Sequence, residues 1–218
     1  MIVCKFGGTS VASAEQIKKV FNIVKSNPER KVVAVSAPGK RSSEDIKVTD
    51  LLIDLAEAAL IGGDVDGKID AVVKRYEDIT IGLGLDHTMS EVIAADLRER
   101  VAGDKSNKEL FIDSLKASGE DNNAKLIATY FNAAGIPARY VSPKEGLVVN
   151  DLPERTYALP EAYDNLSSLK DTEEVVIFPG FFGYTKDGIL RTFDRGGSDI
   201  TGSILASAVG ADLYENFT

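Results

Sequence analysis

The beginning of the chain carries the pattern that most constrains its fold. Met1 to Phe6 is a short, β-branched run bounded by glycine, which predicts a strand. Ser13 and Gln16 form a capping-box pattern, and the apolar residues after them recur at spacings of three and four, so a helix is expected to end near Asn27. Lys31 to Ala37 is almost continuously apolar, as is typical of a buried parallel strand. Strand, helix and strand in this order predict a βαβ unit and a parallel sheet.

The middle of the chain has a different pattern. From about Asp50 to Ala134, the apolar residues follow helical periodicity and there is little strand signal. Three apolar stripes stand out: Leu51, Leu52, Leu55, Ala59 and Leu60; Val92, Ile93, Leu97 and Val101; and Leu126, Ile127, Tyr130 and Phe131. This region, approximately residues 50–134, is expected to form a helical insertion or lid at one edge of the sheet.

Strand signals return in the last third of the chain. Pro137 to Ser142 and Glu174 to Thr185 predict further strands, and the "KDGIL" that follows predicts a hairpin turn. Gly196 to Asp212 opens with glycines and a capping-type serine, Ser198, and continues as a helix of small residues. The sequence "DLYENFT" then starts another strand. The expected fold class is α/β: a three-layer αβα sandwich with a largely parallel central sheet.

The composition narrows the possible partners. The 218 residues carry a formal net charge of −9, so neither nucleic acid nor an anionic membrane surface is an expected partner. No apolar run approaches the ~20 residues that span a bilayer. The single cysteine, Cys4, excludes an internal disulfide and suits a reducing, cytoplasmic location. The single histidine, His87, excludes a histidine-based metal cluster or catalytic triad.

The sequence "KFGGTS", Lys5 to Ser10, stands where the first predicted strand ends. Two glycines let a backbone approach a phosphate closely, hydroxyls follow them, and a lysine supplies the cation. Ligands bind at this edge of open parallel sheets, and Ser36 ends the next strand at the same edge. The common P-loop differs, because its lysine follows the glycines. On spacing alone, a phosphate cradle and a tight turn with a surface lysine both remain open.

The sequence "RGGSD", Arg195 to Asp199, repeats this logic at the start of a helix. Its arginine can bind a carboxylate with two hydrogen bonds, and its aspartate can hold a lysine or act near magnesium. Taken alone, it is an ordinary helix start. Two glycine loops, each with a cation, favour a site between them.

Three other motifs receive structural interpretations. "DVDG", Asp64 to Gly67, has its glycine in the wrong position for an EF-hand and predicts a turn between helices. Cys4 is expected to be a small core residue. Glu120, after Gly119, is expected to precede a helix and to act as a helix-start charge.

Taken together, the motifs resemble those of the aspartate kinases, within the amino acid kinase superfamily. The resemblance covers the whole chain and rests on "KFGGTSV", "VSA", "VTDLL", "SGE", "GFFGYTKDG" and "RGGSD", which occur in the family's order. It implies transfer of the γ-phosphoryl group of ATP, with Mg²⁺, to the side-chain carboxylate of L-aspartate. The product, 4-phospho-L-aspartate, leads towards lysine, threonine and methionine.

The resemblance also implies roles for individual residues. Lys5 would stabilise the transferring group, and Asp199 would organise that lysine. Phosphate-binding residues would be Gly7, Gly8, Thr9, Ser10 and Ser36; substrate-binding residues would be Thr49, Glu120, Arg195 and Ser198. Arg195 would bind the carboxylate of aspartate and Glu120 its ammonium. No protein ligand to the metal is implied.

The chain departs from the family's pattern in two places. Phe193-Asp194 stands where many relatives have Leu-Gly, which puts contacts of the second glycine loop in doubt. The sequence also reaches Thr218 where most of the adenine-nucleotide half and the regulatory domains would follow, so the expected domain is the substrate-binding portion of a longer, homo-oligomeric enzyme. An inactive fragment that binds aspartate or self-associates, and another small-carboxylate kinase, remain as alternatives.

Overall fold

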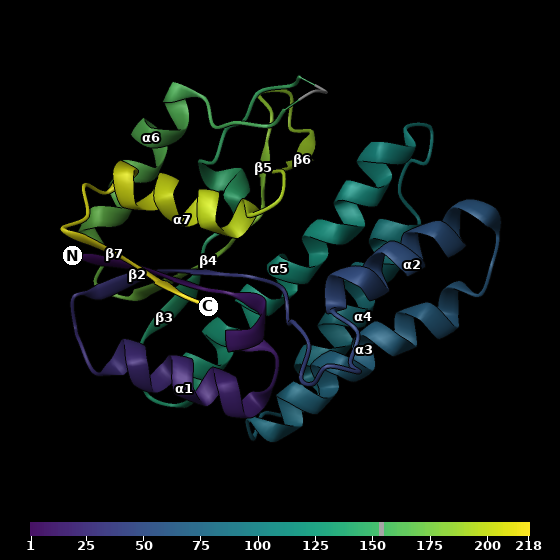
Figure 1. Ribbon diagram of the computed structural model, residues 1–218, viewed down its shortest axis with the longest axis horizontal. Coiled ribbons are helices and arrows are strands. Elements are labelled where there is room, and N and C mark those ends of the chain that lie inside the picture. Colours follow the sequence, from purple (N-terminus) through teal and green to yellow (C-terminus); the bar gives the residue numbers. More distant parts are fainter. Residues whose placement is uncertain (153–154) are drawn as a thin grey trace.

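The computed structural model describes residues 1–152 and 155–218 and has a parallel sheet at its centre (Figure 1). Among these residues, five strands pair in the order β3-β4-β2-β1-β7, and every pairing is parallel. The strands are β1 (Ile2–Phe6), β2 (Arg30–Val35), β3 (Ala138–Tyr140), β4 (Val175–Pro179) and β7 (Leu213–Phe217). All five carboxyl ends therefore lie at one edge of the sheet.

Both faces of the sheet are covered, because the central strands are apolar on both sides. In β2, for example, Val33 and Val35 face one hydrophobic cluster, while Val32 and Ala34 face the other. The first face packs against α1 (Ala14–Lys25) and the second half of α5 (Lys108–Ala133); the second packs against α6 (Pro160–Leu166) and α7 (Gly197–Ala208). The three-layer αβα sandwich is confirmed, and Figure 1 shows the two helical layers above and below the strands.

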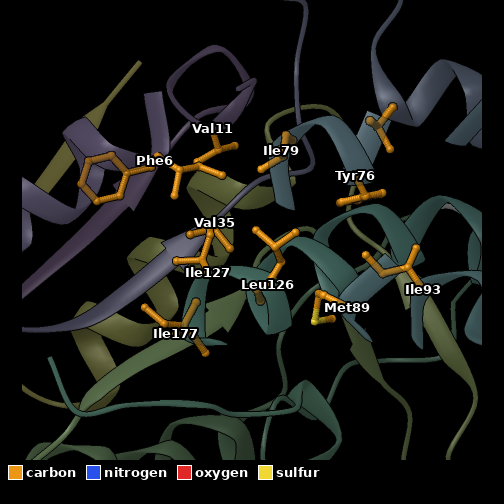
Figure 2. Packing of buried hydrophobic residues seen from close by; sticks show 14 of the residues in the cluster. Phe6, Val11, Val35, Tyr76, Ile79, Met89, Ile93, Leu126, Ile127 and Ile177 are labelled. Atoms are coloured by element: carbon orange, nitrogen blue, oxygen red, sulfur yellow. The ribbon is translucent and has the colours of Figure 1, made fainter. Parts of the chain in front are cut away.

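The predicted helical region is also confirmed, as α2 (Val48–Ile61), α3 (Val65–Gly82), α4 (Thr88–Val101) and α5. The first three stand beside the sheet, whereas α5 continues beneath β3 and β4 and becomes part of the sandwich. One core joins the two parts: Figure 2 shows Tyr76 and Ile93 from the helices in the same cluster as Val35 and Ile177 from the strands.

Local signals explain several boundaries. The Ser13 hydroxyl accepts a hydrogen bond from the backbone N–H of Gln16, and α1 ends at Lys25, near the predicted Asn27. Asp64 caps α3 by accepting from the Gly67 N–H, so "DVDG" is a helix start after a turn. Cys4 is buried, and burial raises the pKa of its thiol to about 12.

Two predicted helix starts are wrong. The capping position of α7 is held by Gly196, whose φ of 83° is unstrained only for glycine, and Ser198 is the second residue inside the helix. Glu120 does not precede a helix: it lies in the middle of α5, because the Gly119 before it continues the helix without interruption.

The remaining elements are short. Strands β5 (Phe182–Tyr184) and β6 (Leu190–Thr192) form the antiparallel hairpin that "KDGIL" predicts. The 3₁₀ turns are η1 (Gly8–Val11), η2 (Pro143–Glu145) and η3 (Ser167–Asp171). Within the described residues, none of the helices combines the length and the apolar character that crossing a membrane requires.

Candidate active site

Lys5 lies near the carboxyl end of β1 and is almost fully buried, with 4% of its surface exposed. Its ammonium is 2.8 Å from Oδ1 of Asp199 in the first turn of α7. The same carboxylate oxygen accepts a 2.8 Å hydrogen bond from Nδ2 of Asn216. The hydrogen bond from Lys5 holds the pKa of Asp199 below its usual value. A buried ammonium requires such a partner, and the pair fixes the lysine in one position.

Three glycines form a close contact between two loops beside Lys5. The Gly39 N–H donates a 2.8 Å hydrogen bond to the Gly8 carbonyl. A Cβ on Gly39 would lie 2.6 Å from the carbonyl carbon of Gly8, and one on Gly7 would lie 3.3 Å from Nζ of Lys5. Side chains at these positions would displace the backbone or the lysine. The loops after β1 and β2 can approach each other this closely because each has glycine at the point of contact.

A cavity of about 400 Å³ opens between these loops and α5. It gathers seven of the residues that the sequence analysis named: Lys5, Gly7, Gly8, Thr9, Ser36, Thr49 and Glu120. It also contains residues that the analysis missed, namely Ala37, Pro38, Gly39, Lys40 and Lys47. The only signal for the missed group was "PGK", directly after the second predicted strand.

Glu120 forms part of this cavity, although only 6% of its surface is exposed. Gly119 lets α5 come this close, since a Cβ there would lie 2.8 Å from Cβ of Ala37. Burial raises the pKa of Glu120 to about 8, and the backbone N–H of Ala37 opposes that rise only in part. Its Oε2 has no hydrogen-bond partner among the described residues. A cationic group bound beside Glu120 would give this oxygen the hydrogen-bond partner that it lacks.

Asn123, one turn after Glu120, holds the end of β2 in place. Its Nδ2 donates a 2.7 Å hydrogen bond to the Ser36 carbonyl, and the Ser36 N–H donates to the Phe6 carbonyl at 3.1 Å. Ser36 is thereby fixed between α5 and β1. Asn123 has no signal in the sequence, because helical periodicity does not reveal which strands α5 packs against.

Ser10 is not brought into the cavity of Lys5. Its backbone N–H closes the η1 turn on the Gly7 carbonyl at 2.9 Å, and this turn carries its side chain to another cavity beside Gln16 and Phe217. The structure therefore does not bring Ser10 together with the other residues expected to bind phosphate.

Arg195 and Ser198 lie outside the cavity as well. Arg195 lines a neighbouring cavity of about 390 Å³, together with Arg155, Arg191, Asp113 and Lys116. Ser198 packs on the end of β4: a Cβ on Gly180 would lie 2.6 Å from its hydroxyl. Helix α5 forms part of both cavities, since Asp113 and Lys116 line the second and Glu120 the first.

Phe181 lines the second cavity, and nothing in the sequence singles it out within "GFFGYT". Its φ of 80° is, among the described residues, the one positive value at a non-glycine position, a conformation that costs roughly 1–2 kcal/mol. The Phe181 N–H donates to Oγ1 of Thr201 at 3.1 Å, and its carbonyl accepts from the Phe193 N–H at 2.7 Å. Nζ of Lys116 lies 5.6 Å from the ring centre. These contacts hold the strained residue at the edge of the second cavity.

Comparison with known proteins identifies the family. A model of the amino acid kinase family matches residues 1–218. The chain belongs to the amino acid kinase family. This family member is 55% identical to aspartokinase 3 of Bacillus subtilis (strain 168), a match that covers 100% of the chain and 48% of that protein. It is 30% identical to the chloroplastic aspartokinase 1 of Arabidopsis thaliana, over 95% of the chain and 38% of that protein. The chain spans about half the length of these relatives, or less.

Solved structures of the amino acid kinase family share the fold. Clostridium acetobutylicum aspartate kinase matches with a TM-score of 0.83 and 32% identity, over 100% of the chain and 47% of that protein. Escherichia coli aspartokinase III, solved in complex with aspartate and ADP, matches with a TM-score of 0.80 and 26% identity, over 99% of the chain and 48% of that protein.

Proposed function

We propose that this chain forms the substrate- and phosphate-binding part of an aspartate kinase, which transfers the γ-phosphoryl group of ATP to the side-chain carboxylate of L-aspartate. One observation carries the proposal. A buried lysine, fixed by Asp199 above the Gly7-Gly8 loop, shares one cavity with the incompletely paired carboxyl of Glu120. One end of the cavity suits a phosphate and the other suits an ammonium, as the two substrates require.

In this proposal, Lys5 acts on the transferring phosphoryl group. In the reaction, a carboxylate oxygen of aspartate forms a bond to the γ-phosphorus, the bond to the bridging oxygen breaks, and ADP leaves with the electron pair. Negative charge spreads over the γ-oxygens, so the enzyme acts by positioning and electrostatic stabilisation. The Lys5 ammonium supplies the positive charge, and the ion pair with Asp199 keeps it in place. The substrate carboxylate is itself the nucleophile, so no covalent enzyme intermediate is needed.

In this proposal, Glu120 and Thr49 bind aspartate. The ammonium of the substrate would complete the hydrogen bonding of Glu120 and bring its pKa down from about 8. Thr49 is the second residue of α2 and offers a hydroxyl to the same cavity. The substrate's α-carboxylate would extend towards Lys116 and Arg195 in the neighbouring cavity, with Phe181 between them.

The described residues suit the phosphates of ATP but offer no cluster of protein ligands for Mg²⁺. The cavity of about 400 Å³ that the loops of Gly7, Gly8 and Gly39 line leaves room for phosphates of ATP beside the Gly7 and Gly8 backbone. For Mg²⁺, the described part of the chain holds no group of three or more acidic or histidine ligands, so we assign no residue to the metal. Mg²⁺ bound to the phosphates would neutralise part of their charge.

A substrate panel tests the proposal. The complete gene product should be assayed with MgATP and either aspartate, glutamate or N-acetylglutamate, and ADP release should be measured. Aspartate-dependent release, with product trapped as a hydroxamate, supports the proposal. Preference for another acid would make the protein a different small-carboxylate kinase. Binding of aspartate without turnover, by the complete gene product, would mean that it is an inactive binding protein.

A further inference from the structure

Arg75, in the middle of α3, makes a forked contact with the segment 38–47. The arginine is buried, with 6% of its surface exposed. Its Nη2 donates a 2.9 Å hydrogen bond to the Gly39 carbonyl, and its Nη1 donates a 2.5 Å hydrogen bond to the Ile46 carbonyl. Nη1 also lies 3.3 Å from Oδ2 of Asp45. One planar guanidinium thus binds both ends of a single loop.

This contact is specific to arginine. Burial of a guanidinium is unfavourable unless its donors are satisfied. Here two main-chain carbonyls accept from Nη1 and Nη2 and one carboxylate pairs with Nη1, while Nε has no partner among the described residues. A lysine carries the same charge but lacks the rigid fork that fixes two acceptors at a set separation. Asp45 in turn binds the Arg41 side chain at 2.8 Å. The segment is therefore held in one shape from the α3 side.

The same segment forms one wall of the candidate active site. Arg75 binds the Gly39 carbonyl, and the N–H of the same residue donates to the Gly8 carbonyl, so Gly39 links Arg75 to the Gly7-Gly8 loop. Lys40 and Lys47, at either end of the segment, line the cavity with Lys5. Both are exposed, and neither ammonium forms an ion pair with any residue in the ranges 1–152 and 155–218. In a chain of net charge −9, two unpaired cations beside a phosphate cradle suit a polyphosphate.

We propose that Arg75 is a positioning residue: it holds the segment 38–47 against the cradle so that Lys40 and Lys47 bind the phosphates of the nucleotide. The inference rests on the proposed function and adds Arg75, Lys40 and Lys47 to the residues that bind the nucleotide or position the groups that do. Arg75 itself touches no phosphate and acts through the geometry of the segment.

Calorimetric titration of the complete gene product with inorganic tripolyphosphate, MgATP and aspartate tests this. Arg75→Met should weaken tripolyphosphate and MgATP binding by about tenfold or more, while the affinity for aspartate changes less than about twofold. Arg75→Lys should behave like Arg75→Met, because charge alone does not hold the loop. Lys74→Met is the matched control: its ammonium lies on an exposed side chain one residue away and, among the described residues, pairs only with Glu77 and Asp78.

A double-mutant cycle separates positioning from a general structural effect. Lys47→Ala should weaken tripolyphosphate binding in the parent protein and have little further effect in the Arg75→Met background. Full additivity, or full rescue of phosphate binding by Arg75→Lys, would overturn the proposal. Should Arg75→Met fail to fold in a thermal unfolding measurement, Asp45→Asn replaces it in the cycle, with the same non-additivity expected. If the parent protein binds neither tripolyphosphate nor MgATP, the proposed function fails together with this inference. If it binds both and the cycle is additive, only the role of Arg75 is lost.

Discussion

The ammonium of Lys5 and the carboxylate of Asp199 form a 2.8 Å ion pair between the first strand of the sheet and the first turn of α7. This contact joins the two glycine loops, which lie at opposite ends of the sequence. Because one partner is buried and the other is half exposed, the pair orients the lysine while leaving the neighbouring cavity open. The ion pair is the structural basis of the site.

Replacement of Lys5 by alanine should remove most of the activity. A lysine that stabilises the transferring phosphoryl group contributes mainly in the transition state, so turnover should fall by at least about 10²–10³-fold. The measurement is kcat for aspartate-dependent ADP release by the complete gene product. Lys19→Ala, on the exposed side of α1, is the control and should be neutral. Near-normal turnover in Lys5→Ala would exclude the assigned role.

Glu120→Gln should stabilise the protein in a pH-dependent way. The folded protein raises the pKa of Glu120 from 4.5 to about 8, so its contribution to stability is fully present below pH 4.5 and is lost as the pH rises through 8. Glutamine stays neutral throughout. The variant should therefore match the parent protein near pH 4.5 and unfold at a higher temperature, by several degrees, near pH 8. A temperature difference that does not change with pH would contradict the raised pKa.

Aspartate binding should release protons near neutral pH. The free site holds Glu120 largely protonated, whereas a bound ammonium favours the carboxylate. Titration calorimetry should be carried out in two buffers with different ionisation enthalpies. The apparent binding enthalpies should differ by up to the difference between the two ionisation enthalpies, which corresponds to the release of about one proton. In Glu120→Gln the two buffers should agree, and aspartate affinity should fall by about tenfold or more, as expected when a charged partner is lost. Equal enthalpies in the parent protein would place the ammonium elsewhere.

Gly39→Ala should damage the cradle more than the fold. The added methyl group would lie 2.6 Å from the carbonyl carbon of Gly8 and must push the two loops apart. Overpacking of this kind costs about 1–3 kcal/mol of stability, and we expect MgATP affinity to fall by about tenfold or more. Gly63→Ala is the matched control, because its new Cβ would meet neighbours no closer than 3.5 Å. Unfolding by urea and titration with MgATP measure the two effects.

The sequence predicted the sheet and its edges well, since these depend on local patterns. The almost continuous apolar run from Lys31 to Ala37 predicts a parallel strand that is buried on both faces. Glycines directly after strands predict loops at the edge of the sheet where ligands bind. The contact of Lys5 with Asp199 is one of the two roles that the sequence leaves open for this aspartate. Parallel-strand geometry alone does not predict the contact, because the second glycine loop follows β6 of the antiparallel hairpin.

What the sequence could not predict depends on packing between distant elements. The Gly119 before Glu120 predicts a helix start, yet α5 continues through this glycine. The glycine lets the helix pack against Ala37, since a Cβ at position 119 would lie 2.8 Å from Cβ of Ala37. Ser198 was assigned to a cap that Gly196 holds by its backbone conformation alone. Arg75 lies in an ordinary charged stretch of α3, and only the folded chain places it against the Gly39 carbonyl.

The order of strands in the sheet has a kinetic consequence. Strand β1 pairs on one side with β2, which is near in sequence, and on the other with β7, whose Glu215 bonds Cys4 across 211 positions. Contacts between such distant segments form late, because the intervening chain must first be ordered. The β1–β2 pair can form soon after synthesis begins, with Lys5 already at its end. Asp199 and the Asn216 that supports it are synthesised only after α2 to α5 and strands β3 and β4. A ribosome-bound nascent chain would therefore carry the Gly7-Gly8 loop long before it carries the partner of Lys5.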